Sequence, residues 1–122
     1  MSTADDSSST EPDIAPLRNI VARNQVWPRM AAKYGVENPV PPWKTSLDGM
    51  CDALDRARCA EPIPDFKERR DEEDSLTSTV YANLPYPENQ LVALAHSLVV
   101  RGIIDETELQ VRLDAVRARL EA

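Results

Sequence analysis

Apolar residues recur along much of this chain at intervals of three and four, the spacing of one face of an α-helix. No segment shows the period-two alternation that is typical of a half-buried β-strand. The pattern therefore predicts an all-α protein, a small helical domain of four to six helices with an extended N-terminal arm.

The composition divides the chain into three parts. Residues 1–14 are rich in Ser, Thr and Asp, and we expect them to be disordered because they contain too few apolar residues to form a core. Residues 15–42 form the arm, which ends in a linker, ENPVPP at 37–42, whose prolines favour extended geometry. Residues 43–122 form the helical domain.

The arm contains a short predicted helix. Leu17, Ile20 and Val21 follow helical spacing until Pro28 interrupts it. These side chains need a surface that buries them. That surface is either another subunit or the arm's own domain, and the sequence leaves both alternatives open.

The first helix of the domain is predicted to begin near Thr45 or Ser46, either of which could be its N-cap. Its apolar stripe consists of Leu47, Met50, Cys51 and Leu54. A loop is predicted at 57–64.

The next predicted helix, around PDFKERRDEED, is polar on nearly every side. Pro64 suits its first turn, and Phe66 is its one large apolar residue before Leu76. The acidic run 71–74 lacks the alternate spacing and central glycine of a calcium loop. We therefore interpret this helix as a solvated surface with ion pairs between successive turns.

A turn rich in tyrosine and proline, residues 81–87, leads into two further helices. The first is apolar around much of its circumference and is predicted to be the most buried helix, with Gly102 at its C-terminal cap. Asp105 is the predicted N-cap of the last helix, and Glu108 would complete a capping box. The apolar stripe of the last helix consists of Leu109, Leu113, Val116 and Leu120.

The net charge of −7 and the isoelectric point of about 4.7 argue against nucleic acid or an anionic membrane as a partner. No apolar run approaches the ~20 residues that span a bilayer. The N-terminus lacks the apolar segment of a secretory signal. We expect a cytoplasmic protein.

Cysteine and histidine are sparse. On one helix, Cys51 and Cys59 would lie roughly 12 Å apart, beyond the ~7 Å between Cα atoms that a disulfide allows, so we expect free thiols. With His96 far away in sequence, they form no metal-ligand pattern, and no metal ligand is predicted on this chain. His96 lies among apolar neighbours and is expected to be a packed residue rather than a general base.

The run from Tyr81 to Leu109 is similar to the helical part of nitrile hydratase β subunits. That family has a tyrosine, then Pro or Ser before Tyr-Tyr-Glu, a buried helix, glycine followed by an aliphatic residue, and an acid-capped last helix. The matching positions here are Tyr81, Pro85, Tyr86, Glu88, Gly102, Ile103, Glu108 and Leu109. Trp43 resembles the tryptophan that opens the family's first core helix, so the resemblance covers about residues 43–113.

The chain most resembles the small β-type subunit of three-component enzymes, such as thiocyanate hydrolase or the nitrile hydratase that acts on toyocamycin. It shares a Thr-Val-Tyr sequence ending at Tyr81 and an arginine pair at 69–70. Two-subunit β chains continue into a β-barrel, whereas this chain ends at Ala122, after its last helix. The resemblance therefore implies a barrel on a separate subunit.

In this family, a non-haem Fe(III) or non-corrin Co(III) is held by the α-type subunit through cysteine sulfurs, two of them oxidised, and backbone amides. A β-subunit arginine hydrogen-bonds the oxidised sulfurs. It precedes the first tyrosine of the motif by eleven positions, which corresponds to Arg70, or to Arg69 if the register shifts by one. A guanidinium fork suits such oxyanions. The resemblance implies that this chain binds no cofactor itself.

Tyr86 matches a tyrosine that lines the family's substrate pocket, where its phenol can donate a hydrogen bond near the metal-bound water or nitrile. Gln90 stands where an aromatic residue is frequent, and Pro87 replaces the second tyrosine of the pair, so the resemblance implies a reshaped pocket. The predicted catalytic residues are Arg70 and Tyr86, and the predicted pocket residues are Tyr81, Tyr86 and Gln90.

The resemblance implies a β-type subunit of a multi-subunit nitrile hydratase, which adds water to a nitrile to give an amide and is inactive as a single chain. Its partners would be an α-type metal-binding subunit, a separate β-barrel subunit and a small nitrile. The alternatives are an activator or metallochaperone of such an enzyme, a thiocyanate hydrolase subunit, or an unrelated helical adaptor.

Overall fold

Six α-helices make up the regular structure in a computed structural model that describes residues 13–56 and 65–121. They are α1 (Ala15–Arg23), α2 (Trp27–Tyr34), α3 (Lys44–Arg56), α4 (Phe66–Ser78), α5 (Glu88–Val100) and α6 (Glu106–Leu120). No strand occurs in these two ranges, so the all-α prediction is confirmed there. The loop predicted at 57–64 and residues 1–12 of the predicted disordered segment 1–14 lie outside the described residues. The prediction of disorder was wrong at Ile14, which is buried in the core.

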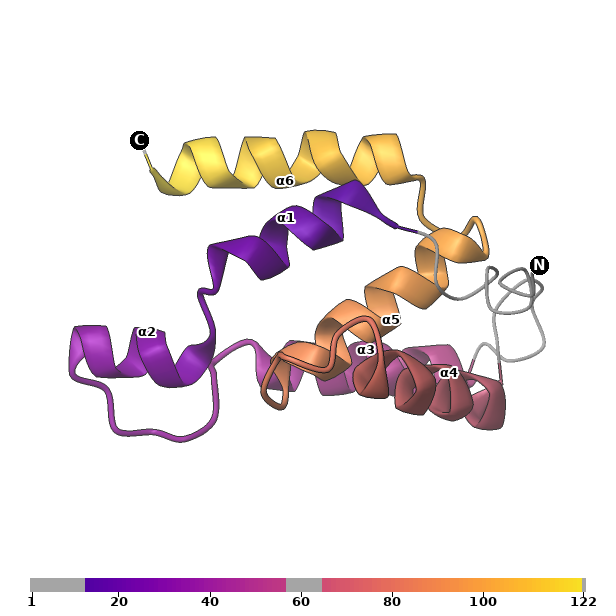
Figure 1. Cartoon of the computed structure of the whole chain (residues 1–122), viewed down its shortest axis with the longest axis horizontal. Helices are drawn as coiled ribbons and strands as arrows, with labels where there is room; N and C mark the ends of the chain where they lie inside the picture. Colours follow the sequence, from indigo (N-terminus) through magenta and orange to yellow (C-terminus); the bar gives the residue numbers. More distant parts are fainter. Residues whose placement is uncertain (1–12, 57–64, 122) are drawn as a thin grey trace.

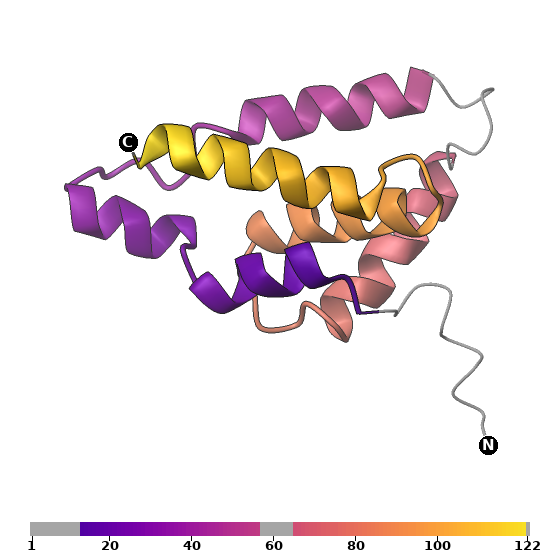
Figure 2. The ribbon, with the colours of Figure 1, turned by 90° about the horizontal axis from the view of Figure 1, so that it is seen from above.

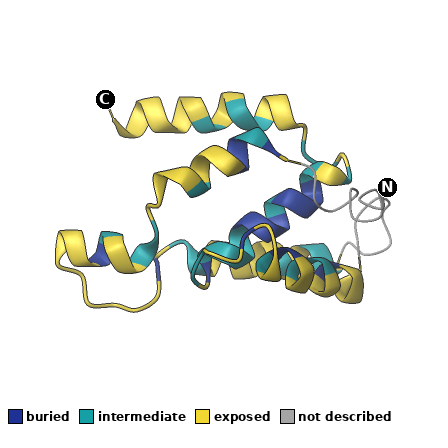
Figure 3. Cartoon of the chain, in the orientation of Figure 1, coloured by how far each residue is buried: buried dark blue, intermediate teal, exposed yellow. Residues whose placement is uncertain are grey.

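α5 lies at the centre of the domain and is its most buried helix, as the sequence predicts (Figures 1 and 3). One apolar cluster joins α5 to α1, α4 and the turn before α5, through Ile14, Leu17, Leu76, Tyr81, Val92 and Ala93. A second cluster joins α5 to α3, through Leu47, Leu94 and Leu98. The two clusters use different faces of one helix, so α5 connects them.

The first helix of the N-terminal arm packs on its own domain. α1 contacts both α5 and α6, and it runs beside α6 (Figures 1 and 2). Ile14 and Leu17 are buried in the first cluster. Of the two alternatives for this segment, the structure therefore shows the one in which it packs on its own domain. α1 ends at Arg23, with Asn24 as its left-handed C-cap, and a second helix begins at Trp27 with Pro28 in its first turn.

The ends of α5 and α6 agree with the predicted capping residues. Gly102 has a left-handed φ of 78°, and its N–H donates to the Val99 carbonyl over 3.0 Å. The Asp105 carboxylate accepts from the Glu108 N–H over 2.9 Å. The Glu108 carboxylate accepts from Arg112. The described contacts therefore include one of the two hydrogen bonds of a capping box.

Two predicted helix starts were wrong. α3 begins at Lys44, so Thr45 and Ser46 lie inside its first turn rather than at its N-cap. At α4, Asp65 and Glu68 form a complete capping box, with N–O distances of 2.8 and 3.1 Å. Since Asp65 is the N-cap, α4 begins at Phe66; Pro64, which was predicted in its first turn, lies outside the described residues.

α4 is attached to the domain through charged side chains as well as through Leu76, which corrects the interpretation of a solvated helix. The guanidinium of Arg69 is buried and pairs with Asp55 of α3. Glu72 pairs with Arg101, just after α5, and both side chains are largely buried. Phe66, the one large apolar residue of the helix before Leu76, is exposed, and Leu76 is the large apolar residue of α4 in the core. Residues 69, 72 and 76 share one helical face, where polar groups replace an apolar stripe.

None of the helices in the described ranges combines the length and the apolar character needed to cross a bilayer.

The fold predicts a sharp contrast between two leucines. Leu76 is completely buried at the α4–α5 contact, so Leu76→Ala should lower the free energy of unfolding by about 2–5 kcal/mol through lost burial and a cavity. Leu120 is 76% exposed, and Leu120→Ala should change it by less than about 0.5 kcal/mol. Urea denaturation followed by circular dichroism measures both. Equal losses would contradict this packing.

Candidate functional site

The turn between α4 and α5, residues 79–87, holds its two tyrosines in opposite environments. The Tyr81 N–H donates to the Leu76 carbonyl over 2.8 Å, and the Leu84 N–H donates to the Tyr81 carbonyl over 3.2 Å. These bonds keep the turn against the end of α4 and direct Tyr81 into the core. Tyr86, five residues later, is 64% exposed.

Tyr81 is bound to the one histidine of the chain. Its hydroxyl lies 2.7 Å from Nδ1 of His96, which is fully buried in α5. The two rings meet edge to face, with centroids 5.5 Å apart and planes at 78°. The phenol donates to Nδ1 in the tautomer that carries the imidazole proton on Nε2. His96 is therefore a packed residue, as predicted, and Tyr81 is its partner.

Burial raises the pKa of the Tyr81 phenol to about 12. The cause is the loss of water around the phenolate, which the apolar first cluster cannot replace. Tyr81 is consequently a neutral hydrogen-bond donor throughout the physiological pH range. Since its side chain is enclosed by its own domain, it stabilises the turn that carries Tyr86.

Tyr86 projects from the turn and is contacted by Lys44, at the start of α3. The Lys44 ammonium lies 5.5 Å from the centroid of the Tyr86 ring and pairs with Asp48 one turn along the same helix. A hydrogen bond with Asp48 and a second with Tyr86 raise the pKa of Lys44. The exposed phenol is thus held beside a fixed positive charge.

Arg69 and Arg70, the two alternatives for the predicted sulfur-binding arginine, lie in different environments. Arg69 is 7% exposed, pairs with Asp55 and packs over the Phe66 ring, with its guanidinium carbon 5.6 Å from the ring centroid. The Arg70 side chain is 60% exposed, and its Nε lies 3.9 Å from Asp74. Of the pair, Arg70 is the residue that another molecule can reach.

Three consecutive side chains in the first turn of α5 have buried oxygens without a hydrogen-bond partner. These are Oε1 of Glu88, Oδ1 of Asn89 and Oε1 of Gln90. The other Glu88 oxygen accepts a hydrogen bond from the backbone N–H of Trp27. Gln90, a predicted pocket residue, is half-buried, and its unpartnered amide oxygen is itself buried.

The predicted site residues do not converge on one point. Tyr86 contacts Lys44 at the start of α3, whereas Arg69, next to Arg70, contacts Asp55 near its end. The eleven steps between those α3 residues, at ~1.5 Å each, separate them by roughly 16 Å. Arg70 and Tyr86 therefore occupy two regions of the surface.

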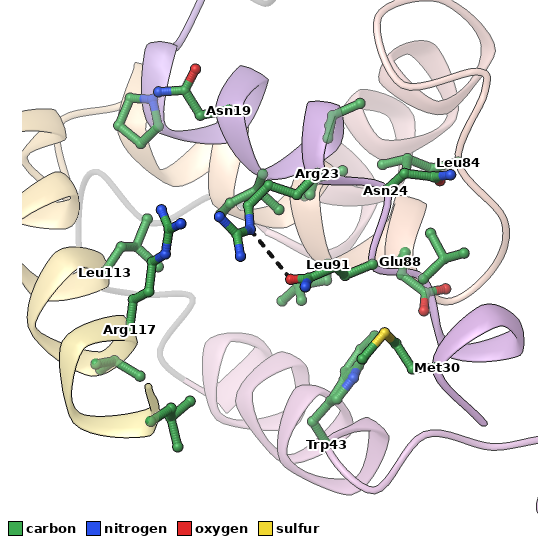
Figure 4. A pocket seen from close by; sticks show the side chains of 18 of the residues that line it. Asn19, Arg23, Asn24, Met30, Trp43, Leu84, Glu88, Leu91, Leu113 and Arg117 are labelled. Carbon is green, nitrogen blue, oxygen red and sulfur yellow. Dashed lines mark hydrogen bonds between the residues drawn. The ribbon is translucent and has the colours of Figure 1, made fainter. Parts of the chain in front are cut away.

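A large groove that sequence reasoning missed lies between α6 and the rest of the domain. It has a volume of about 640 Å³. Figure 4 shows Leu113 and Arg117 of α6 facing Glu88 and Leu91 of α5, with Arg23 and Trp43 on the other two sides. The one feature of the sequence that points to this groove is the apolar stripe of α6. Its residues Leu113, Val116 and Leu120 line the groove and are not buried in a core. Arg70, Tyr81, Tyr86 and Gln90 do not line it.

The described residues contain no group of three or more histidine, cysteine, aspartate or glutamate side chains placed to hold a metal ion. Cys51 is a free, half-buried thiol, and burial raises its pKa. A raised thiol pKa disfavours the thiolate that binds metals. Cys59 lies outside the described residues.

Comparisons of the chain with models of protein families, with curated proteins and with solved structures find no match.

The Tyr81–His96 pair predicts a specific pH dependence of stability. The pKa of Tyr81 is about 12 in the folded protein and ~10 when unfolded, so its contribution is complete below pH ~10 and is lost as the pH rises towards 12. Tyr81→Phe should reduce the loss of stability between pH ~10 and pH ~12. It should also lower the free energy of unfolding at pH 7 by about 1–3 kcal/mol, because His96 loses its hydrogen-bond donor.

Urea denaturation between pH 7 and pH 12 measures both effects. Tyr34→Phe is the matched control, since Tyr34 is 67% exposed and should change neither quantity. An alkaline loss of stability that is identical in wild type and Tyr81→Phe would contradict the role of this hydrogen bond.

Proposed function

We propose that this chain is a β-type subunit of a multi-subunit nitrile hydratase, and that it completes an active site whose metal belongs to another subunit. The proposal rests on the resemblance of residues 43–113 to that family. The structural observation that supports it best is the outward Arg70 beside the buried Arg69. A subunit that binds oxidised sulfurs on its partner needs an arginine whose side chain is exposed and whose backbone position is fixed.

Arg70 has the properties that this role requires. Its single described ion pair, with Asp74, is long and exposed, so little energy is lost when a stronger anion replaces it. Arg69 holds the same turn of α4 against α3. In the complex, the Arg70 guanidinium would donate to the sulfinate and sulfenate oxygens of the partner subunit and keep those ligands oriented.

Tyr86 would act at the substrate. Its phenol is exposed, and Lys44 keeps the ring beside the start of α3. Because Tyr86 and Arg70 occupy two regions of the surface, Tyr86 would form part of the wall of the substrate pocket and would not contact the metal-bound nitrile. Gln90, half-buried in the first turn of α5, would be the polar residue at the position where the family frequently has an aromatic side chain. Tyr81 would serve this pocket indirectly, by fixing the turn.

The metal of the partner subunit, Co(III) or Fe(III), would supply Lewis-acid activation of the nitrile or of water. The residues of this chain would orient the metal's ligands and the substrate. The product would be the amide.

Purification of the tagged protein from its native host tests the assembly. We expect a stable stoichiometric complex with a subunit that contains Cys-x-x-Cys-Ser-Cys and holds cobalt or iron. The complex should hydrate nitriles, and the single chain should not. A transient association with the metal-free subunit alone would instead identify an activator, and turnover by the isolated chain would exclude the subunit role.

Replacement of Arg70 tests the site within that complex. Arg70→Ala should reduce kcat about 10–100-fold, because the oxidised sulfurs lose a charged donor, while metal content falls much less. Turnover and metal analysis on the same preparation measure this. Arg112→Ala is the matched control: Arg112 is also an exposed arginine that pairs with a glutamate on its own helix, yet it lies on α6. Full activity of Arg70→Ala would refute the assignment.

A further inference from the structure

α2 is the helix with the weakest attachment to the domain. The substantial contacts among the described helices are α4–α5, α1–α5 and α1–α6, and α2 takes part in none of them. In two perpendicular views it lies beyond the end of α5 (Figures 1 and 2). Ala31 is its one buried residue, whereas Tyr34 is 67% exposed. Apolar packing alone therefore fixes α2 only weakly.

A carboxylate of α5 holds the start of α2. Oε2 of Glu88 accepts a hydrogen bond from the backbone N–H of Trp27, the first residue of α2. In the described part of the chain, it is the one hydrogen bond that joins α2 to another helix. The N-cap residue of α2, Val26, provides no side-chain acceptor, and the first turn contains no acid. Glu88 thus supplies, from another helix, the acceptor and the negative charge that a helix N-terminus favours.

α2 and the loop that follows it are bonded to each other. The indole N–H of Trp27 donates to the Asn38 carbonyl over 2.7 Å. The N–H of Val36 donates to the Ala31 carbonyl over 2.8 Å. Neither bond involves the rest of the domain, so residues 27–38 can move together while both bonds persist.

The short link between α1 and α2 provides a hinge. It consists of residues 24–26, and Asn24 has a left-handed φ of 53°, a conformation that asparagine adopts more readily than most residues. The side-chain hydrogen bonds at this link, from Arg23 to Gln25 and from Arg29 to the Asn24 carbonyl, are exposed and 3.3 Å long. Hinges of moving segments are a few residues at the end of an element, as here.

The docked position of α2 leaves the second oxygen of Glu88 without a donor. This oxygen, Oε1, is buried. A buried acceptor without a partner costs free energy, and the cost is larger for a charged group. Water can reach the oxygen once α2 moves away, so undocking removes this cost. The bond to Trp27 and the burial of Ala31 oppose it, and the two positions of α2 therefore differ little in free energy.

We propose that α2 is a flap that opens and closes beside the first turn of α5, and that Glu88 is its latch. Opening removes the wall that Val26, Met30 and Tyr34 contribute to the groove, and it gives water access to the start of α5, two residues after Tyr86. The inference goes beyond the proposed function, because it concerns a movement within this chain and does not depend on nitrile chemistry.

Nuclear magnetic resonance of the full chain, labelled with ¹³C at its methionine methyl groups, tests the movement. Met30 lies in α2, and Met50 lies in α3 and serves as an internal control. Relaxation dispersion should show exchange between two states at the Met30 methyl and none at Met50. Glu88→Ala leaves the Trp27 N–H without an acceptor in the closed state, so it should raise the open population about tenfold. Glu88→Gln keeps an acceptor oxygen and should retain most of the closed population.

Glu108→Ala is the matched control variant. Glu108 also lies in the first turn of a helix, where it accepts from Arg112 on the same helix, so its loss should leave the Met30 signal unchanged. Three outcomes would overturn the proposal: no exchange at Met30, equal open populations in wild type and Glu88→Ala, or equal changes at Met30 and Met50. Because the test uses the chain without partners, a failure here leaves the hydratase experiment unaffected.

Discussion

The burial of α5 is the constraint on which this fold depends. Its apolar side chains point in nearly all directions, so the helix is stable in water only when neighbours cover it on several sides. α1 and α4 supply one set of neighbours, and α3 supplies the other. The same enclosure surrounds His96, whose ring requires a polar partner in the core, and Tyr81 provides it from the turn before α5.

Charge pairs hold α4 on this core where apolar residues are missing. Arg69 contacts α3 and Glu72 contacts the segment after α5, so the two pairs connect α4 to both of its neighbours. Pairs of this kind stabilise a structure less reliably than apolar packing, because desolvation offsets their attraction. They do, however, fix orientation, since a guanidinium bonds well in few directions.

The sequence predicts what local rules determine and fails where partners are distant. The all-helical class, the buried α5 and the caps at Gly102 and Asp105 all follow from spacing and side-chain type within a few residues. The burial of Arg69 does not, because it depends on Asp55 across an interhelical contact. Helical periodicity also could not show that the α6 stripe would line an open groove, since an apolar stripe looks the same whether or not its partner is in the same chain. The placement of Tyr81 inside the core required its pairing with His96, fifteen residues away.

The adjacency of Arg69 and Arg70 links the stability of the fold to the proposed function. Successive residues on a helix point about 100° apart. The ion pair between Arg69 and Asp55 of α3 fixes the rotation of α4, and it therefore also determines the direction in which Arg70 points. An arginine on a rigid helix loses less conformational freedom on binding than one on a loop, and more of its binding energy is therefore retained. A change at Arg69 would disturb the direction of Arg70 as well as the packing of α4. Arg69 thus orients Arg70, although Arg70 is the one of the two that a partner can contact.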